Sequence, residues 1–298
     1  METVDSIPIW QKHKDVLTTA GVDFDKIIEI RKDIHKHAEG SFKEFETQKK
    51  IIKFFTDLEH QDFRIMASTG VVVDIKGTSE ETTDTDCSCI ALRADMDALP
   101  MVEETGVEHQ SVTDHAHMCG HDGHVATLLA TGQYFILNKN KLPKNKIIRL
   151  IFQPAEEGFG GAEPMIKEGC LEGVDEIYGF HNVPFGQEGT VTVKPKEFMA
   201  GIVVVEIEIE GKGGHGSEPA KSIDPITTAC NLHNALHTIK SRNLMNTDVC
   251  AFTICSFQSG TTFNVIPRTA SMSGSIRYFD LKVKDIVCEK IKSLTKNI

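Results

Sequence analysis

Five of the 13 histidines lie close together around one cysteine in the first half of the chain. They are His109, His115, His117, His121 and His124, and the cysteine is Cys119. A thiolate and an imidazole separated by one glycine can both turn toward one centre, because glycine allows the tight backbone that this needs. Cys119 and His121 are therefore candidate metal ligands. The alternative is a buried thiol beside surface histidines.

Two adjacent glutamates, Glu156 and Glu157, follow the apolar run 147–152 (IIRLIF), which is typical of a buried strand. Two carboxylates at the end of such a strand are costly to bury unless something positive compensates them. A dinuclear metal centre would do so, with one glutamate binding metal and the other acting as a general base toward water. The alternative is a solvated loop.

Further polar side chains follow two other predicted strands. His181 comes after the run 176–180, and Asp95 and Asp97 follow the run 89–92. Open α/β sheets place their sites at the carboxyl ends of strands, so these residues are expected beside the candidate ligands. Asp95 and Asp97 are candidates for orienting a ligand imidazole. The alternatives are a core histidine with satisfied hydrogen bonds and a salt bridge to the nearby arginine.

The second half of the chain contains three more candidates. A glycine-rich stretch, 211–217 (GKGGHGS), presents His215, and 260–267 (GTTFNVIP) contains Asn264. Arg277 suits bidentate binding of a carboxylate, with a surface ion pair as the alternative. A phosphate-binding loop is a poor interpretation, because no Lys-Ser/Thr pair follows the glycines at the required spacing.

Alternating helical and strand patterns predict the scaffold of the first half. Apolar residues recur at helix-face spacing over about 23–58 and 124–137, and short apolar runs predict strands at 70–75, 89–92, 147–152 and 176–180. A polar, acidic stretch at 77–86 is typical of a surface loop. This alternation indicates an α/β sheet covered on both faces.

The pattern changes near Gly189. The run 201–210 (GIVVVEIEIE) alternates apolar and charged residues, which predicts a strand with one wet face. A helix over 224–241, strands at 249–257 and 270–279, and a helix over 281–296 follow. They predict a small two-layer α+β domain that lacks one strand. We therefore expect two domains, 1–189 and 190–298.

Composition excludes several classes of protein. The 298 residues include 32 basic and 43 acidic side chains, and a net charge of −11 disfavours binding to nucleic acid or to an acidic membrane. No stretch approaches the ~18 apolar residues of a membrane span, and the first residues lack the features of a secretory signal. Eight irregularly spaced cysteines are expected to be reduced thiols. We expect a cytoplasmic protein.

Five motifs occur in an order that resembles a known family. They are 91–100 (ALRADMDALP), 119–124 (CGHDGH), 152–158 (FQPAEEG), 211–215 (GKGGH) and 264–267 (NVIP). Together they resemble the aminoacylase, hippurate hydrolase and auxin-conjugate (IAA-amino acid) amidohydrolase branch of the dinuclear metallopeptidases. The resemblance runs from about Ile30 to Phe279 and includes an N-terminal signature at 31–35. Ala38 and Gly40 stand where the family usually has Pro and Leu.

The resemblance implies a metallopeptidase catalytic domain, a mixed sheet flanked by helices, with an inserted smaller α+β lid domain that also mediates dimerisation. It implies two divalent ions, Mn or Zn, and four ligands: Cys119, His121, Glu157 and His181. Cys119 is a candidate bridging ligand. Glu156 is implied as the general base, and Asp97 is placed in the catalytic set.

In the lid, the resemblance implies that His215 and Asn264 polarise the scissile carbonyl, with His215 supplied by the partner subunit of a homodimer. Arg277 is implied to hold the substrate carboxylate. The implied function is metal-dependent hydrolysis of the amide bond of N-acyl amino acids by attack of an activated water. Ala220 replaces a histidine found in many relatives, which leaves the substrate within this class open.

Relatives of this branch continue beyond the position of Ile298, so we expect both domains to be incomplete. The continuation supplies a last histidine ligand, and its loss would leave one metal ion in place of two. The second hypothesis is therefore a catalytically inactive homologue that retains dimerisation or binding. A third, Cys119 as a nucleophile with a histidine base, leaves the paired glutamates unexplained.

Overall fold

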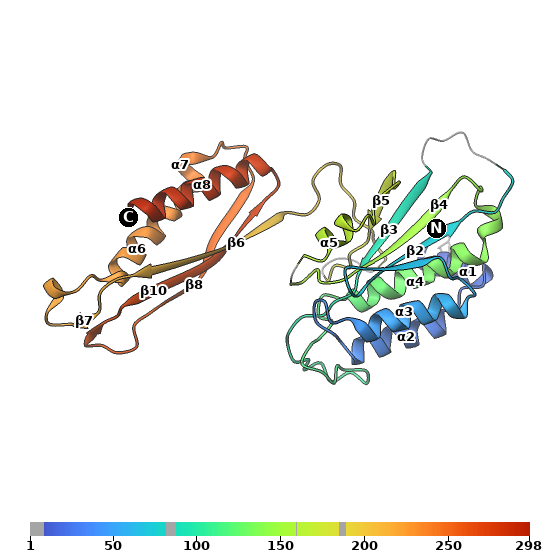
Figure 1. Ribbon diagram of the computed structural model, residues 1–298, viewed down its shortest axis with the longest axis horizontal. Coiled ribbons are helices and arrows are strands. Elements are labelled where there is room, and N and C mark those ends of the chain that lie inside the picture. Colours follow the sequence, from blue (N-terminus) through green and yellow to red (C-terminus); the bar gives the residue numbers. More distant parts are fainter. Residues whose placement is uncertain (1–8, 82–87, 159, 185–188) are drawn as a thin grey trace, which may run out of the picture. The chain divides into compact units, whose positions relative to one another are not determined.

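The computed structural model describes residues 9–81, 88–158, 160–184 and 189–298 (Figure 1). It divides into two compact units, Met1–Thr190 and Val191–Ile298. Within the described residues, no helix combines the length and the apolar character that crossing a membrane would require.

The first unit is built on a mixed five-stranded sheet in the order β1-β2-β4-β3-β5. Its strands are β1 (Phe63–Met66), β2 (Gly70–Lys76), β3 (Cys89–Asp95), β4 (Ile147–Gln153) and β5 (Glu176–Gly179). β1, β2 and β4 are antiparallel neighbours, whereas β4, β3 and β5 run parallel. The carboxyl ends of these three strands therefore meet at one edge of the sheet.

Helices cover one face of this sheet (Figure 1). They are α2 (Phe24–Lys36), α3 (Phe45–Asp57) and α4 (His121–Leu137), and α1 (Ile9–Thr19) precedes them. The main core of the unit lies between these helices and the sheet. It contains the fully buried side chains of Ile34, Phe55 and Leu129 from the helices and of Val73 and Phe152 from the sheet.

The other face is covered less completely. The short helix α5 (Ala162–Lys167) places Met165 against Val72 and Ile151, whose side chains alternate with those of the main core. The expectation of a sheet covered on both faces is wrong for β5, whose four residues are all exposed. Among the described residues β5 pairs with β3 alone, so it is an edge strand.

Other boundaries of the first unit also differ from the predicted ones. The helical pattern over 23–58 is two helices separated by a turn, and α4 begins at His121 rather than three residues later. Strand β1 was not predicted. The described part of the acidic stretch, 77–81, is irregular apart from a bridge between Ser79 and Pro143, and 82–86 lies outside the described residues.

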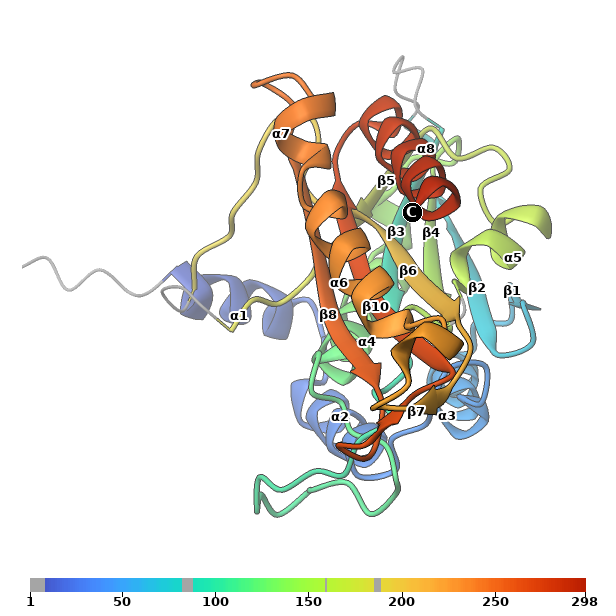
Figure 2. The same cartoon turned by 90° about the vertical axis from the view of Figure 1, so that its left-hand side faces the viewer.

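The second unit is a three-stranded antiparallel sheet in the order β6-β10-β8. Its strands are β6 (Gly201–Glu210), β8 (Cys250–Ser259) and β10 (Thr269–Tyr278), and α6 (Pro225–Leu236), α7 (Ile239–Asn243) and α8 (Leu281–Asn297) pack on one face (Figure 2). β6 has the predicted alternation of exposed and covered residues. The helix predicted over 224–241 is instead two, α6 and α7. A two-stranded pair, β7 (Gly214–His215) with β9 (Val265–Ile266), was not predicted.

Candidate metal centre

Polar side chains gather at the carboxyl edge of β3, β4 and β5. Asp95 ends β3, Glu156 and Glu157 follow β4, and His181 follows β5. The first turn of α4 adds His121, which is completely buried together with Asp95. The predicted site residues thus come from four separate segments, three of which carry the predicted ligands, and the parallel part of the sheet brings these segments to one place.

The imidazole of His121 is held so that one nitrogen faces the carboxylates. Its Nδ1 lies 2.8 Å from the backbone oxygen of Asp97, and because a carbonyl oxygen can only accept, Nδ1 carries the proton. Its Nε2 is buried and has no hydrogen-bond partner among the described residues, and the same is true of Glu157 Oε1. These two atoms lie 3.7 Å apart. Buried polar atoms nearly always have a hydrogen-bond partner, so two such atoms without a described partner need an explanation.

The spacing of these atoms fits a shared cation. His121 Nε2 lies 3.6 Å from Asp95 Oδ2 and 3.9 Å from Glu156 Oε2, in addition to the 3.7 Å to Glu157. Such separations are long for hydrogen bonds. Ligands that bind one zinc ion at 2.0–2.2 Å in a tetrahedral arrangement are separated by about 3.4 Å. The residues therefore fit a divalent metal.

Cys119 and His181 complete the group. Cys119, His121 and Glu157 each present a ligand atom, and the three atoms lie within 4.8 Å of one another. His181 donates from Nδ1 to the backbone oxygen of Asn182 at 2.7 Å, which leaves Nε2 free to face Cys119 Sγ at 3.5 Å. The four predicted metal ligands thus lie in one cluster.

Gly120 allows Cys119 and His121 to turn toward the same centre. Its φ of 86° lies in the left-handed region, and a Cβ there would come within 2.5 Å of Asn182 Nδ2. Both the backbone angle and the close approach of Asn182 favour glycine. This agrees with the reason that the sequence suggests for a glycine between the two ligands.

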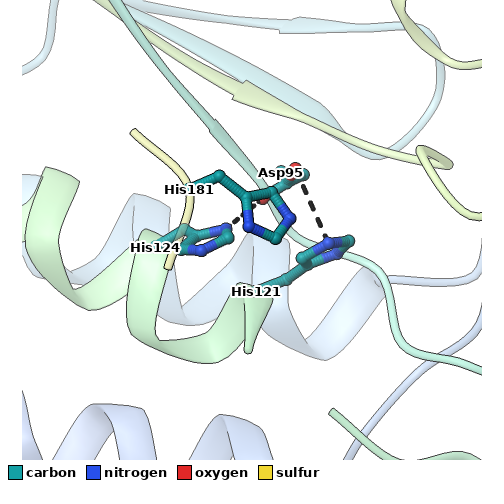
Figure 3. A group of neighbouring side chains, drawn as sticks. All are labelled: Asp95, His121, His124 and His181. Atoms are coloured by element: carbon teal, nitrogen blue, oxygen red, sulfur yellow. Dashed lines mark hydrogen bonds and ion pairs between the residues drawn. The ribbon is translucent and has the colours of Figure 1, made fainter. Parts of the chain in front are cut away.

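A second group of possible ligands overlaps the first: Asp95, His121, His124 and His181 (Figure 3). His124 is not free to bind metal, because Nδ1 donates to Asp95 Oδ1 at 2.5 Å and Nε2 accepts the backbone N–H of Asn182 at 3.0 Å. We therefore interpret His124 as a residue that holds Asp95. The sequence did not predict the contact of His124 with Asp95, although His121 and His124 are three residues apart at a helix start and so share one face.

Asp95 is held in its charged form. Burial alone would raise the pKa of Asp95, but the hydrogen bond from His124 and the charges of His121 and Arg93 outweigh burial, so the pKa lies below its usual value. Arg93 also donates to Asp95 Oδ2 at 2.7 Å, so the ion pair considered from the sequence exists. The remaining face of Asp95 Oδ2 is turned toward His121.

Asp97 supports the turn that carries the two glutamates. Its Oδ1 accepts the N–H of Glu156 at 2.9 Å, and its Oδ2 accepts the N–H of Glu157 at 3.0 Å and the hydroxyl of Ser41 at 2.7 Å. With its backbone oxygen on His121, Asp97 touches both a candidate ligand and the candidate base. The geometry is that of an orienting residue.

Glu156 differs from the two aspartates in its electrostatic surroundings. Burial and the neighbouring charges of Glu157 and Asp95 raise the pKa of Glu156 above its usual value. Its side chain is 42% exposed, so water can reach it. A carboxylate with a raised pKa beside a candidate metal site is suited to taking and returning a proton near neutral pH.

The same surroundings disfavour Cys119 as a nucleophile. Burial, followed by the hydrogen bond and charge of Glu157, raises the pKa of the Cys119 thiol to about 12. Catalytic thiolates need the opposite, a site of positive charge that lowers the pKa. A bound cation would supply that charge and deprotonate the thiol as a ligand.

Three predicted residues lie in the second unit. His215 in β7 pairs with Val265 of β9, and the N–H of Gly216 donates to the backbone oxygen of Asn264 at 2.8 Å, so His215 and Asn264 are on adjacent segments. Arg277 lies near the other end of β10. The nine residues from Thr269 to Arg277 span about 25 Å in a strand. Within this unit, His215 and Asn264 are therefore close and Arg277 is far from both.

Comparisons with known proteins agree with this arrangement. Residues 91–277 match the model of peptidase family M20/M25/M40. An N-acetylcysteine deacetylase of Bacillus subtilis (strain 168) is 38% identical over 92% of this chain and 70% of its own length. A hippurate hydrolase of Campylobacter jejuni is 38% identical over 90% of this chain and 68% of its own length. A crystal structure of a dinuclear metal binding peptidase of the M20 family from Bacillus subtilis superposes with a TM-score of 0.73 at 34% identity, over 92% of this chain and 69% of that one.

Proposed function

The chain belongs to peptidase family M20/M25/M40, and from this membership we propose that it hydrolyses the amide bond of N-acyl amino acids at a divalent-metal centre. The observation that carries the proposal is the pair of buried, unpartnered atoms, His121 Nε2 and Glu157 Oε1, beside Cys119. The deacetylase and the hippurate hydrolase among the relatives support the substrate class.

Four residues would hold the metal: Cys119, His121, Glu157 and His181. When bound, a divalent metal supplies Lewis acidity that polarises the scissile carbonyl and lowers the pKa of water. We assign to Asp97 and Asp95 the orientation of His121 and of the carboxylate turn, on the contacts described above.

Glu156 is the proposed general base. Its carboxylate faces the cluster, with Oε2 3.9 Å from His121 Nε2, and its raised pKa suits proton transfer. Glu156 takes the proton of the attacking water and then delivers it to the nitrogen of the leaving amino acid. The protonated nitrogen leaves as a neutral amine. Without this proton it would have to leave as an unstable amide anion.

The metal identity and the cellular location are parts of the proposal. A thiolate and two imidazoles suit Zn²⁺, whereas the carboxylates also suit Mn²⁺. The two overlapping groups of candidate ligands agree with one bound ion or with two. A reducing compartment, the cytoplasm, is proposed because Cys119, a candidate ligand, forms no disulfide bond with any described residue.

We also propose that the substrate is bound by two subunits of a homodimer. His215 and Asn264 would polarise the carbonyl, and Arg277 would bind the substrate carboxylate. On one lid, Arg277 lies near one end of β10 and the other two residues lie beyond the opposite end, and the span of about 25 Å along this strand is too long for an N-acyl amino acid to bridge. If all three serve one site, they must come from different copies of the chain.

The test compares the chain with its Glu156→Gln variant on N-acetyl and N-benzoyl amino acids. We expect the wild type to release free amino acid and the variant to lose about 10² to 10⁴-fold in kcat, because glutamine cannot take a proton. Metal content per chain, measured by atomic emission, should be the same in both. An undiminished rate in Glu156→Gln would rule out its role as the base.

A further inference from the structure

The turn that carries the two glutamates is strained at its first residue. Ala155 follows β4 through Pro154, is completely buried and has a φ of 52°. The left-handed region is unfavourable for a residue with a Cβ, so surrounding contacts must hold Ala155 there. The side chains of the next two residues, Glu156 and Glu157, both approach His121 in the candidate metal site.

A buried carboxylate from a distant part of the chain binds Ala155. Oε1 of Glu44 accepts the N–H of Ala155 at 2.9 Å and the N–H of Phe42 at 3.0 Å, and Oε2 accepts the hydroxyl of Thr69 at 2.5 Å. Glu44 is 0% exposed. Phe42, like Ala155, has a left-handed backbone, with a φ of 59°. One oxygen thus binds the amides of two residues that both have left-handed backbones.

Glu44 does this in place of an ordinary structural role. It is the N-cap residue of α3, yet its side chain makes no capping hydrogen bond. Glu39 caps the helix instead, because its carboxylate accepts the N–H groups of Glu46 at 3.0 Å and Thr47 at 2.9 Å. The helix therefore does not need the carboxylate of Glu44, which is directed at the turn.

Two buried carboxylates together hold three successive amides. Glu44 binds the N–H of Ala155, and Asp97 binds those of Glu156 and Glu157. Asp97 also contacts His121, whereas no contact with a candidate ligand is described for Glu44. Each carboxylate thus binds a different part of the turn, and it is Glu44 that binds the strained residue, Ala155.

We propose that Glu44 is a positioning residue for the reaction, which sets the left-handed backbone of Ala155 and so aims the carboxylate of Glu156 at the metal site. This inference rests on the proposed function of Glu156. Without Glu44, the N–H of Ala155 has no other acceptor among the described residues to compensate the strain, and the peptide can relax toward an extended conformation. Glu156 would then lose its alignment while remaining chemically intact.

The kinetic test uses three substitutions at this position. We expect Glu44→Ala to lower kcat for an N-acetyl amino acid by about 10²-fold, the cost of a misplacement of about 1 Å, with KM within about twofold of wild type. Glu44→Gln keeps an acceptor oxygen for the two amides, so it should retain most of the activity. Should Glu44→Ala not fold, Glu44→Asp decides the question: it keeps a buried acid but shortens its reach, and kcat must fall.

The matched control is Glu39→Ala. It removes a carboxylate that binds two amides of α3 but does not touch the turn. We expect it to lower stability without changing kcat. If Glu39→Ala lowers kcat as much as Glu44→Ala does, or if Glu44→Asp keeps the wild-type kcat, the effect is not positioning and the proposal is overturned.

A second readout does not depend on activity. The amide of Ala155 should be protected from hydrogen exchange in the wild type, and Glu44→Ala or Glu44→Asp should raise exchange in the peptide 154–157 by at least tenfold. Glu39→Ala should raise it only at the start of α3. If the wild type hydrolyses no N-acyl amino acid, the proposed function fails, and the exchange result still decides whether Glu44 sets the turn. Unchanged exchange at 154–157 would overturn the proposal.

Discussion

Four carboxylates meet at the carboxyl edge of the sheet in the first unit, and each has different surroundings. Hydrogen bonds and positive neighbours hold the pKa values of Asp95 and Asp97 below their usual range despite burial. Burial and negative neighbours raise the pKa of Glu156. Glu157 has a buried oxygen without a described partner. These surroundings agree with the proposed roles of the four carboxylates: two orienting groups, one base and one ligand.

The thiol of Cys119 allows a prediction that needs no substrate. Because burial and Glu157 raise its pKa to about 12, the metal-free protein contains little Cys119 thiolate at pH 8. We expect iodoacetamide to alkylate it at least roughly tenfold more slowly than an ordinary exposed thiol, even though a more basic thiolate is a better nucleophile. Peptide mass spectrometry measures both rates, with the exposed Cys230 as the internal control. Equal rates would contradict the raised pKa and favour the nucleophile hypothesis.

At the scale of the elements, Gly120 constrains the junction between Cys119 and the start of α4. Gly120 has a left-handed backbone and leaves no room for a Cβ beside Asn182. We expect Gly120→Ala to destabilise the protein by about 1–2 kcal/mol and to weaken metal binding, because Cys119 and His121 would no longer converge. Chemical denaturation and a zinc titration measure the two effects.

Gly123 in the first turn of α4 is the matched control. A Cβ there would meet no atom within 4 Å, and its backbone angle is not left-handed. Gly123→Ala should therefore be neutral or stabilising by up to about 1 kcal/mol, with unchanged metal affinity. If the two substitutions have the same effect, Gly120 is not needed for the geometry of the site.

Elements with a strong periodic pattern could be predicted from the sequence. The apolar run 147–152 predicted β4, and the alternation over 201–210 predicted β6 together with its exposed face. The start of α4 was missed because its N-cap is Gly120, which offers no capping side chain. β1 was missed because it is a four-residue edge strand with two exposed residues.

The candidate site could be predicted only in part. The motifs pointed to Cys119, His121, Glu157 and His181 as one cluster, because Cys119 and His121 flank a glycine, whereas Glu157 and His181 follow predicted strands. The contacts of Glu44 with Ala155 could not be predicted, since the two residues are 111 positions apart in sequence. Patterns within a segment predict local structure, but which distant carboxylate binds a turn depends on the packing of the whole unit.

At the scale of the whole molecule, the two units divide the candidate residues. The proposed ligands and the proposed base belong to the first unit, and the three proposed substrate-binding residues belong to the second. The proposed homodimer explains why the second unit presents His215 and Asn264 at one end and Arg277 near the other. Each lid would then contribute to two sites.

Mixing two inactive variants tests this arrangement. A chain with His215→Ala keeps its own base, and a chain with Glu156→Gln keeps a lid with His215. If His215 acts on the partner subunit's site, mixed dimers contain one intact site and should recover about a quarter of the wild-type rate after random exchange. Each variant alone is the control. No recovery, with exchange verified by mass spectrometry, would place His215 in the site of its own chain.

The central claim is that these residues form a metal centre that drives amide hydrolysis, and a metal titration tests it most directly. The protein is stripped with a chelator, and Zn²⁺ or Mn²⁺ is added back while the bound metal per chain and the hydrolysis of an N-acetyl amino acid are measured together. We expect no hydrolysis without metal and a rate that rises in proportion to the metal bound until the site is filled. Metal-free protein that hydrolyses the substrate at an unchanged rate would contradict the account.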